Sequence, residues 1–205
     1  MGKYNVNKGK LCRRFGTNLF GNLKFDKLLA KRSNPPGQHG AAATRKKLSE
    51  FGRQLKEKQK LKIAYGLREK QFKIIFERSM KMKGVTGDNL LRQLELRLDN
   101  VIFRLGFAPG RSAARQLVGH GHVSVNGRRT NIPSYTVREG DVITVKDASK
   151  SKALVQRGLD SARSDVPQWL ILEKDEMKGS IARLPLKEEI PVLADEHMIV
   201  ELYSK

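Results

Sequence analysis

The stretch 97–127 constrains the fold of this chain more than any other. Apolar residues recur along its first part at the spacing of one helix face, and a Pro-Gly turn at 109–110 then reverses the chain. Ser112 is a suitable N-cap for a second, shorter helix. An alternating strand at 123–125 leads into the hairpin dipeptide Asn-Gly at 126–127. The pattern predicts a small unit in which two helices pack on a hairpin.

The polar side of this unit is basic. Between 97 and 129 the chain carries six arginines and two histidines but a single carboxylate, Asp99. A face that only keeps a protein soluble usually mixes both signs. We therefore expect these basic side chains to lie in solvent, where they can bind a polyanion.

Three helices are predicted before this unit, the third of them beginning at Thr86, and a basic arm precedes them. Ser49 is expected to cap a helix of about four turns, and a second helix follows and ends near residue 83. Residues 1–43 lack a sustained period and are expected to form a basic arm that either folds back irregularly or orders on RNA. Strands are expected at 142–145 and 169–172. The predicted fold class is therefore α+β.

The net charge points to an anionic partner. The chain carries 41 Lys and Arg against 21 Asp and Glu, a formal charge of +20, which favours nucleic acid or an anionic membrane surface. The excess is concentrated in residues 1–62, with 17 basic and three acidic residues, whereas residues 170–205 hold five basic and eight acidic ones. No apolar run approaches the ~20 residues of a spanning helix, and the N-terminus lacks the apolar core of a secretory signal. We expect a cytoplasmic protein.

No motif for catalysis or for a cofactor stands out. Cys12 is the only cysteine, and with His39 as a distant companion it cannot complete a tetrahedral zinc site. A Walker loop, an HExxH motif and a credible Ser/His/Asp set are all missing from the sequence. Glu139 and Asp141 are better explained as turn residues than as paired catalytic acids. We expect neither enzymatic activity nor a metal or other cofactor.

Several motifs resemble one known family. RLDNVIFRLGF, SAARQLVGHGH, VNGRR and PSYTVREGD, all within 97–141, are similar to the RNA-binding domain named after the fourth protein of the small ribosomal subunit. NPPGQHG at 34–40, KLSEFGRQLKEKQKLKIAYG at 47–66, TGDNLL at 86–91 and IVELYSK at 199–205 extend the likeness to that ribosomal protein family, in its bacterial form, from end to end.

The resemblance implies a domain order and a function. It implies an arm at 1–43, a helical domain at 44–96 that segment 171–205 completes, and an inserted RNA-binding domain at 97–170. A protein of this family is a structural ribosomal protein that binds small-subunit ribosomal RNA at a multi-helix junction, nucleates small-subunit assembly and contributes to translational accuracy. The implied partners are this RNA, the fifth small-subunit ribosomal protein and messenger RNA near the entry channel, with no membrane and no small-molecule substrate.

The candidate RNA-binding residues are mostly arginines and lysines. An arginine fork can hold a phosphate bidentately, whereas lysine adds less selective attraction. Because A-form helices hide their base edges, recognition is expected to rest on phosphates, junction geometry and 2′-hydroxyl groups. The candidates are Arg13, Arg14, Arg45, Lys46, Lys47, Arg53, Lys56, Lys60, Arg97, Asn100, Arg104, Arg111, Arg115, His120, His122 and Arg128. The resemblance places the turn at 45–47 near the messenger.

Three other functions compete with this one. The small domain also resembles an appendage of RNA-modifying enzymes (pseudouridine synthases) and of a tRNA synthetase, which would require a separate catalytic domain. A helix-turn-helix DNA regulator would use 111–119 as its reading helix, and it usually dimerises. A membrane-surface binder is disfavoured because lysines occupy several faces of the helix at 50–65. Competition between folded RNA and duplex DNA separates the ribosomal RNA-binding function from the DNA-regulator function.

Overall fold

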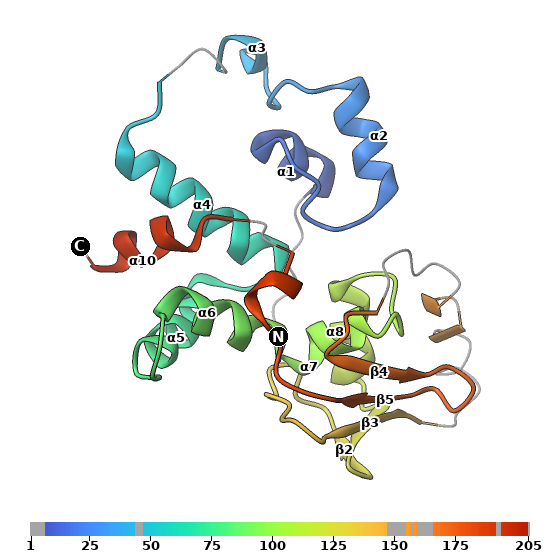
Figure 1. Cartoon of the computed structure of the whole chain (residues 1–205). Coiled ribbons are helices and arrows are strands. Elements are labelled where there is room, and N and C mark those ends of the chain that lie inside the picture. Colours follow the sequence, from blue (N-terminus) through green and yellow to red (C-terminus); the bar gives the residue numbers. More distant parts are fainter. Residues whose placement is uncertain are drawn as a thin grey trace. The chain divides into compact units, whose positions relative to one another are not determined.

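The computed structural model describes residues 7–43, 47–146, 155–156, 158–159, 166–191 and 194–204. The chain divides into two compact units (Figure 1). The first unit combines Met1–Lys73 with Val192–Lys205, and the second is Ile74–Pro191. The second unit is thus inserted, along the chain, between the two segments of the first.

The arm at the start of the first unit is more regular than we expected. It contains α1 (Lys8–Phe15), α2 (Leu23–Lys31) and the short α3 (Gly40–Ala43). The side chain of Asn7 caps α1 by accepting a hydrogen bond from the backbone N–H of Lys10, and Gly16 ends α1 with a positive φ of 70°. Helices of about two turns are too short to show a clear hydrophobic period, which is why the sequence pattern missed them.

The helical part of the first unit is built from both ends of the chain. It contains α4 (Glu50–Ala64), α10 (Glu196–Ser204) and the first turn of α5 (Glu69–Met80). Ser49 caps α4 as predicted, with its Oγ accepting from the N–H of Gly52 at 3.2 Å. α10 packs beside α4 (Figure 1), and Gln54 donates to Glu201 across that contact at 2.9 Å.

The second unit is a five-stranded antiparallel sheet with helices. Among the described residues, its helices are the part of α5 from Ile74 onward, α6 (Thr86–Glu95), α7 (Leu98–Arg104), α8 (Arg111–Gly119) and the 3₁₀ turn η1 (Lys187–Glu189). Its strands are β1 (Val123–Val125), β2 (Arg128–Thr130), β3 (Val142–Val145), β4 (Leu170–Glu173) and β5 (Lys178–Ile181), in the order β2-β1-β3-β5-β4. This arrangement confirms the predicted α+β fold class.

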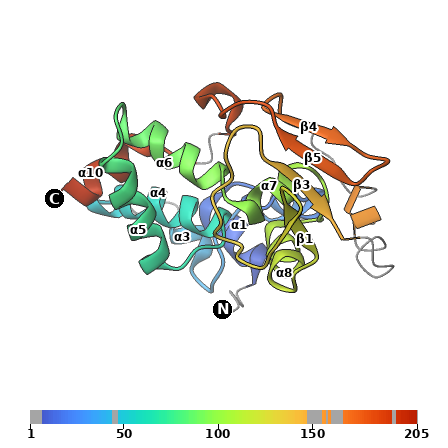
Figure 2. The same cartoon turned by 90° about the horizontal axis from the view of Figure 1, so that it is seen from below.

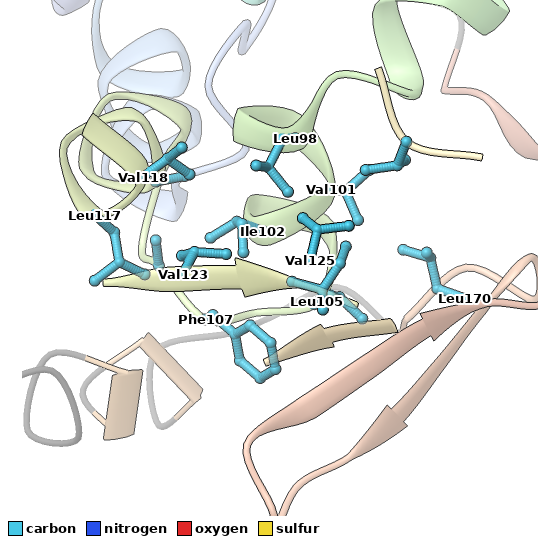
Figure 3. Packing of buried hydrophobic residues seen from close by; sticks show 14 of the residues in the cluster. Leu98, Val101, Ile102, Leu105, Phe107, Leu117, Val118, Val123, Val125 and Leu170 are labelled. Carbon is cyan, nitrogen blue, oxygen red and sulfur yellow. The ribbon is translucent and has the colours of Figure 1, made fainter. Parts of the chain in front are cut away.

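The core of the second unit lies between its helices and the sheet. α7 and α8 lie on one side of the sheet (Figure 2). Figure 3 shows Ile102 of α7 and Leu105, the residue after this helix, close to Val123 and Val125 of β1, with Leu117 of α8 beside them. These positions are the ones that the helical and alternating patterns assigned to the interior. α7 and α8 are therefore fixed to the sheet through a continuous apolar layer.

The start of α8 differs from the prediction. The helix begins at Arg111 and follows Gly110, so Ser112 lies in its first turn and is not its cap. The carbonyl of Gly110 accepts hydrogen bonds from the N–H groups of both Ala113 and Ala114 at 3.0 Å. The turn geometry of Pro109-Gly110 sets the helix start, and this places Arg111 at the first helical position.

Strand β5 is the element that the sequence analysis missed in this unit. Its residue Gly179 lies against α7, because a Cβ atom there would lie 2.6 Å from Cδ1 of Leu105. Glycine has a low strand propensity, so a close packing requirement hides this strand from pattern analysis. The sheet consequently extends to residue 181, beyond the range 97–170 expected for the inserted domain.

Candidate RNA-binding surface

Asp99 joins the first turn of α7 to α8 through two arginines. Arg97 donates to both oxygens of Asp99, at 3.1 Å from Nε and 2.9 Å from Nη2. Arg115 of α8 donates to Oδ2 of the same carboxylate, at 2.8 Å from Nε and 2.6 Å from Nη2. The side chain of Asp99 is 3 % exposed and that of Arg97 is 7 % exposed. The carboxylate is therefore buried, with two guanidinium groups around it.

Glu95 is the centre of a second set of hydrogen bonds beside that of Asp99. Its carboxylate accepts from Nε and Nη2 of Arg104 at 2.9 and 2.7 Å, and from the side-chain amide of Asn100 at 2.8 Å. The other end of Asn100 accepts from Nε of Arg111 at 2.7 Å. The Arg111 guanidinium also lies 4.7 Å from the ring centre of Phe103, within cation–π range.

We call Arg97, Arg104, Arg111 and Arg115, with Glu95, Asp99 and Asn100, the arginine cluster. It holds four guanidinium groups against two carboxylates, so its formal charge is +2. The buried carboxylates require partners because an unpaired buried charge is costly. Each arginine is consequently held in a defined position.

The expectation that all these side chains lie in solvent was wrong. Arg97 is 5 % and Asn100 is 1 % exposed, and the Arg104 side chain is 10 % exposed. Arg115 retains 23 % of its side-chain exposure, and Arg111 is also only partly buried. Sequence pattern placed these residues on a polar face correctly, but it did not reveal the acids that turn the inner ones inward. Arg111 and Arg115 are the members that present charge outward.

A second group of basic side chains follows the cluster at the hairpin. Asn126 and Gly127 both have positive φ, 50° and 76°, as the predicted two-residue turn requires. Arg128 on β2 and His120 after α8 are exposed, and His122 is partly exposed. Arg129 donates from Nε to the carbonyl oxygen of Gly121 at 3.1 Å, which ties the hairpin to the loop that carries both histidines.

The predicted residues of α4 lie together. Arg53, Lys56 and Lys60 are spaced three and four residues apart, and they line one side of a groove of about 790 Å³ beside the first turn of α10. We call these three residues the α4 basic face. Arg53 is exposed and the two lysines are half-buried. Lys60 has Glu57 as a neighbour at 3.5 Å. This face presents positive charge from side chains that are loosely held.

Two other lysines of α4 are held more tightly. Lys58 and Lys62 contact the two oxygens of Glu69 at 2.5 and 2.7 Å. Burial opposes ionisation of this carboxyl group, but the hydrogen bonds from both lysines outweigh it and lower the pKa of Glu69 to about 2. Glu69 also accepts from the hydroxyl of Tyr203 on α10 at 3.2 Å. This contact joins α10 to Glu69 of α5, which the two lysines of α4 hold in turn.

The predicted arm residues have different roles. Arg13 donates to the carbonyl oxygens of Asn34 and Pro35 at 2.9 and 3.3 Å, so it holds the loop of the NPPGQHG motif. Arg14 is exposed. Cys12 is fully buried, and burial raises the pKa of its thiol. Cys12 therefore packs as a small apolar residue, as expected.

The structure describes only one residue of the predicted basic turn at 45–47. Lys47 is exposed, whereas Arg45 and Lys46 lie outside the described residues. Within the described ranges, no three His, Cys, Asp or Glu side chains gather closely enough to hold a metal ion. None of the described helices is long and apolar enough to cross a bilayer.

The sequence analysis missed Glu95 and Asp99 as the residues that organise the surface. The signal was present in part, since Asp99 is the only acid in a strongly basic stretch. An isolated acid among arginines suggests a buried pairing as readily as a solvated turn. Which arginines it pairs with depends on how α7 packs on α8, and this is not readable from spacing.

Comparisons with known proteins agree with this architecture. Residues 3–95 match the family model described as the ribosomal protein S4/S9 N-terminal domain, and residues 96–143 match the model of the S4 domain. The small ribosomal subunit protein uS4 of Borrelia hermsii is 49% identical over 207 residues, which cover 100% of this chain and 99% of the relative. The uS4 proteins of Thermoanaerobacter sp. strain X514 and Akkermansia muciniphila are each 50% identical over the full length of both chains. The chain therefore belongs to the uS4 family of small ribosomal subunit proteins.

Proposed function

We propose that this protein binds small-subunit ribosomal RNA at a multi-helix junction, nucleates assembly of the small subunit and contributes to translational accuracy. It acts as a structural component of the cytoplasmic ribosome, not as an enzyme. The observation that carries the proposal is the arginine cluster, in which Asp99 and Asn100 hold Arg115 and Arg111 at fixed positions. We also propose the division into arm, helical domain and inserted RNA-binding domain.

The cluster suits phosphate binding because its geometry is set before RNA arrives. An arginine that is already immobilised loses little conformational entropy when it binds. A guanidinium group can hold a phosphate bidentately and can stack on an exposed base. Arg111 and Arg115 are one helical turn apart at the start of α8. They are therefore able to contact neighbouring phosphates of one RNA strand.

The other basic side chains attract RNA electrostatically, but no buried acid among the described residues holds them in fixed positions. His120 and Arg128 at the hairpin, Arg14 on the arm and the α4 basic face are exposed or half-buried. Binding through many such contacts releases counterions, so affinity should fall steeply with salt. In this proposal the cluster selects the junction shape and the remaining cations strengthen the complex.

The further partners rest on the family resemblance. We propose contact with the fifth small-subunit ribosomal protein and with messenger RNA near the entry channel. The groove beside α4 supports a protein partner, since it is lined by Arg53 and Lys56 as well as by Asp195 and Glu196. Exposed Lys47 is available to the messenger. A role in accuracy would follow from these two contacts.

The DNA-regulator alternative is weakened by the direction of two side chains. A reading helix projects its polar side chains into the major groove. Arg111 and Arg115 of α8 are instead tied back to Asn100 and Asp99. α8 is therefore better suited to present a fixed pair of charges to a backbone than to probe base edges.

The test is a competition for the purified full chain. A transcript of the small-subunit 5′ domain should bind with a far lower Kd than transfer RNA or duplex DNA of equal length at moderate salt. In reconstitution, omission of the protein at the first step should slow the joining of later proteins more than omission at a late step. Equal affinity for the three nucleic acids would overturn the RNA proposal. Indifference to the order of addition would overturn the assembly role.

A further inference from the structure

The arm contains a second basic feature that none of the predicted residues describes. α1 and α2 enclose a groove of about 490 Å³, lined by Lys8, Lys24, Lys27 and Lys31, with Phe25 and Leu28. The groove exists because α1 comes very close to α2 at Gly9, where a Cβ atom would lie 2.8 Å from Cδ2 of Leu28. The two helices therefore meet at one point and leave a channel beside it.

The charge of this groove is uncompensated along α2. Lys24, Lys27 and Lys31 are exposed, and in the described part of the chain no carboxylate lies within ion-pair distance of their ammonium groups. Asp26, the one acid of α2, does not line the groove and accepts from the side chain of Asn18 at 2.8 Å. The groove thus concentrates positive charge.

The apolar side of α2 is only partly covered. None of the nine residues of α2 is buried, although the helix carries Leu23, Phe25, Leu28 and Leu29. Phe25 has one aromatic neighbour, Phe20, with ring centres 5.7 Å apart and tilted planes. The Phe25 ring is only partly buried. An apolar and aromatic side that remains open between lysines fits a ligand with both a flat apolar face and a negative charge.

We propose that the α1–α2 groove binds a single, unpaired strand of RNA, with its phosphates on Lys24, Lys27 and Lys31 and one base stacked on Phe25. An unpaired base exposes the face that an aromatic ring needs, whereas a duplex keeps its bases stacked internally. Lysines are flexible point charges, which suit a strand without fixed geometry better than a preset junction. The proposal deepens the proposed function, because it assigns this arm a different RNA element from the one bound by the arginine cluster.

The test uses a reporter in the groove of the full chain. Trp169 is the only tryptophan and is 1 % exposed in the core of the second unit, so a Phe25→Trp variant adds one reporter that a stacked base can quench. A ten-nucleotide uridine strand should quench it saturably. A ten-base-pair RNA duplex and polyglutamate of equal charge should not.

Charge variants in the Phe25→Trp background test the role of the lysines. Lys24→Gln with Lys27→Gln and Lys31→Gln should lower the slope of log affinity against log salt by about 2, since each single-strand phosphate contact contributes about 0.7. The matched control is Lys70→Gln with Lys73→Gln and Lys81→Gln, three exposed lysines of α5 and the residue after it. The control should leave the quench and the slope unchanged.

A direct measurement completes the design. Phe25→Ala should weaken binding of a labelled uridine strand to the groove about five- to 150-fold, the range for loss of one stacked base. Absent quenching, equal quenching by duplex or by polyglutamate, or equal effects of the two lysine triples would each overturn the inference. If the 5′-domain transcript binds and the groove reporter stays silent, the groove inference alone fails. If the transcript does not bind, the proposed function fails, whatever the reporter shows.

Discussion

The arginine cluster and the α4 basic face carry positive charge in two different ways. In the cluster, each guanidinium group lies 2.6–3.1 Å from a carboxylate or amide oxygen, and the acids that hold them are nearly inaccessible. On α4, Arg53 is exposed, Lys56 is half-buried, and Lys60 has its acid at 3.5 Å. The arginine cluster therefore holds its positive charges at defined positions. The α4 basic face contributes positive charge without defined positions.

The difference separates specificity from attraction. Guanidinium groups in fixed positions bind one arrangement of phosphates most tightly, because a displaced phosphate loses directional hydrogen bonds. Ammonium groups on flexible side chains bind any dense array of phosphates, and salt screens their attraction to it. A sequence-based count of basic residues treats the two regions alike. Experiments that remove equal charge from each region are therefore the way to test whether they differ.

The largest effect is expected for the acid at the centre of the cluster. Asp99→Asn leaves Arg97 buried without its counter-charge, and loss of one partner from a buried pair costs about 3–5 kcal/mol of the free energy of unfolding. The charge-matched change on α4, Glu57→Gln, removes a weakly held, partly exposed pair, worth at most about 1 kcal/mol. Urea unfolding followed by Trp169 fluorescence reports the unit that contains Asp99.

Far-ultraviolet circular dichroism on the same samples reports the helices of both units. If Asp99→Asn and Glu57→Gln shift the free energy of unfolding by equal amounts, the claim that the cluster is a buried, organised network is refuted. An Asp99→Asn protein that unfolds at lower urea by fluorescence should retain the ellipticity of the first unit, because Asp99 and the residues that it contacts belong to the second unit.

The same contrast explains which parts of the fold were predictable. The helices α4, α7 and α8 and the strands β1 and β3 follow from hydrophobic period, caps and the Asn126-Gly127 turn, all of which are local signals. The sequence pattern did not indicate β5, because glycine at position 179 has a low strand propensity. Close packing against Leu105 leaves no room for a side chain there. The helices of the arm were hidden because each is too short for a period to emerge.

The sequence predicted which residues belong to the site, but not which residues they pair with. Spacing along the chain placed Arg97, Arg104 and Asn100 on one face, and the structure holds them in two adjoining sets of hydrogen bonds, with Arg97 on Asp99 and the other two on Glu95. Their burial depends on Glu95 and Asp99, which belong to α6 and α7, and on the crossing of α7 with α8. Such contacts join elements by tertiary packing, so no spacing rule within one helix encodes them.

The next largest effect concerns RNA affinity. Arg111→Ala with Arg115→Ala should weaken binding of the 5′-domain transcript by about 100-fold or more, because two charge-assisted hydrogen bonds of about 1.5–3 kcal/mol each are lost. Lys56→Ala with Lys60→Ala removes the same charge and should cost about tenfold or less at low salt. Filter binding across a salt series measures both.

The salt series sharpens the comparison. As salt rises, the difference between wild type and the lysine pair should vanish, since screening removes what those lysines contribute. The difference for the arginine pair should persist, since directional contacts survive screening. Parallel salt curves for the two pairs would show that the arginines also act only as a charge density. Trp169 fluorescence verifies that the second unit remains folded in both variants, and far-ultraviolet circular dichroism verifies that the helices of the first unit remain folded at every salt concentration.

The smallest effect tests a pairing that is intermediate between the two regions. Glu69 is held by Lys58 and Lys62, but its side chain is 47 % exposed. Its pKa in the folded protein is lowered from 4.5 to about 2, so its stabilising contribution is present above about pH 4.5 and declines as the pH falls toward 2. Because solvent screens so exposed a pair, we expect that contribution to be under about 1 kcal/mol.

Glu69→Gln should therefore destabilise the protein slightly at pH 7 relative to Glu77→Gln, an exposed acid on the same helix, and the difference should shrink as the pH approaches 3. The carboxyl carbon shift of Glu69 in an NMR titration should have its midpoint near 2, not near 4.5. A midpoint near 4.5 would mean that the two lysines hold Glu69 no better than water does. The last turn of α10, where Tyr203 donates to Glu69, would then depend more on the ring of Tyr203, which stacks on Phe72 and lies under the ammonium group of Lys58.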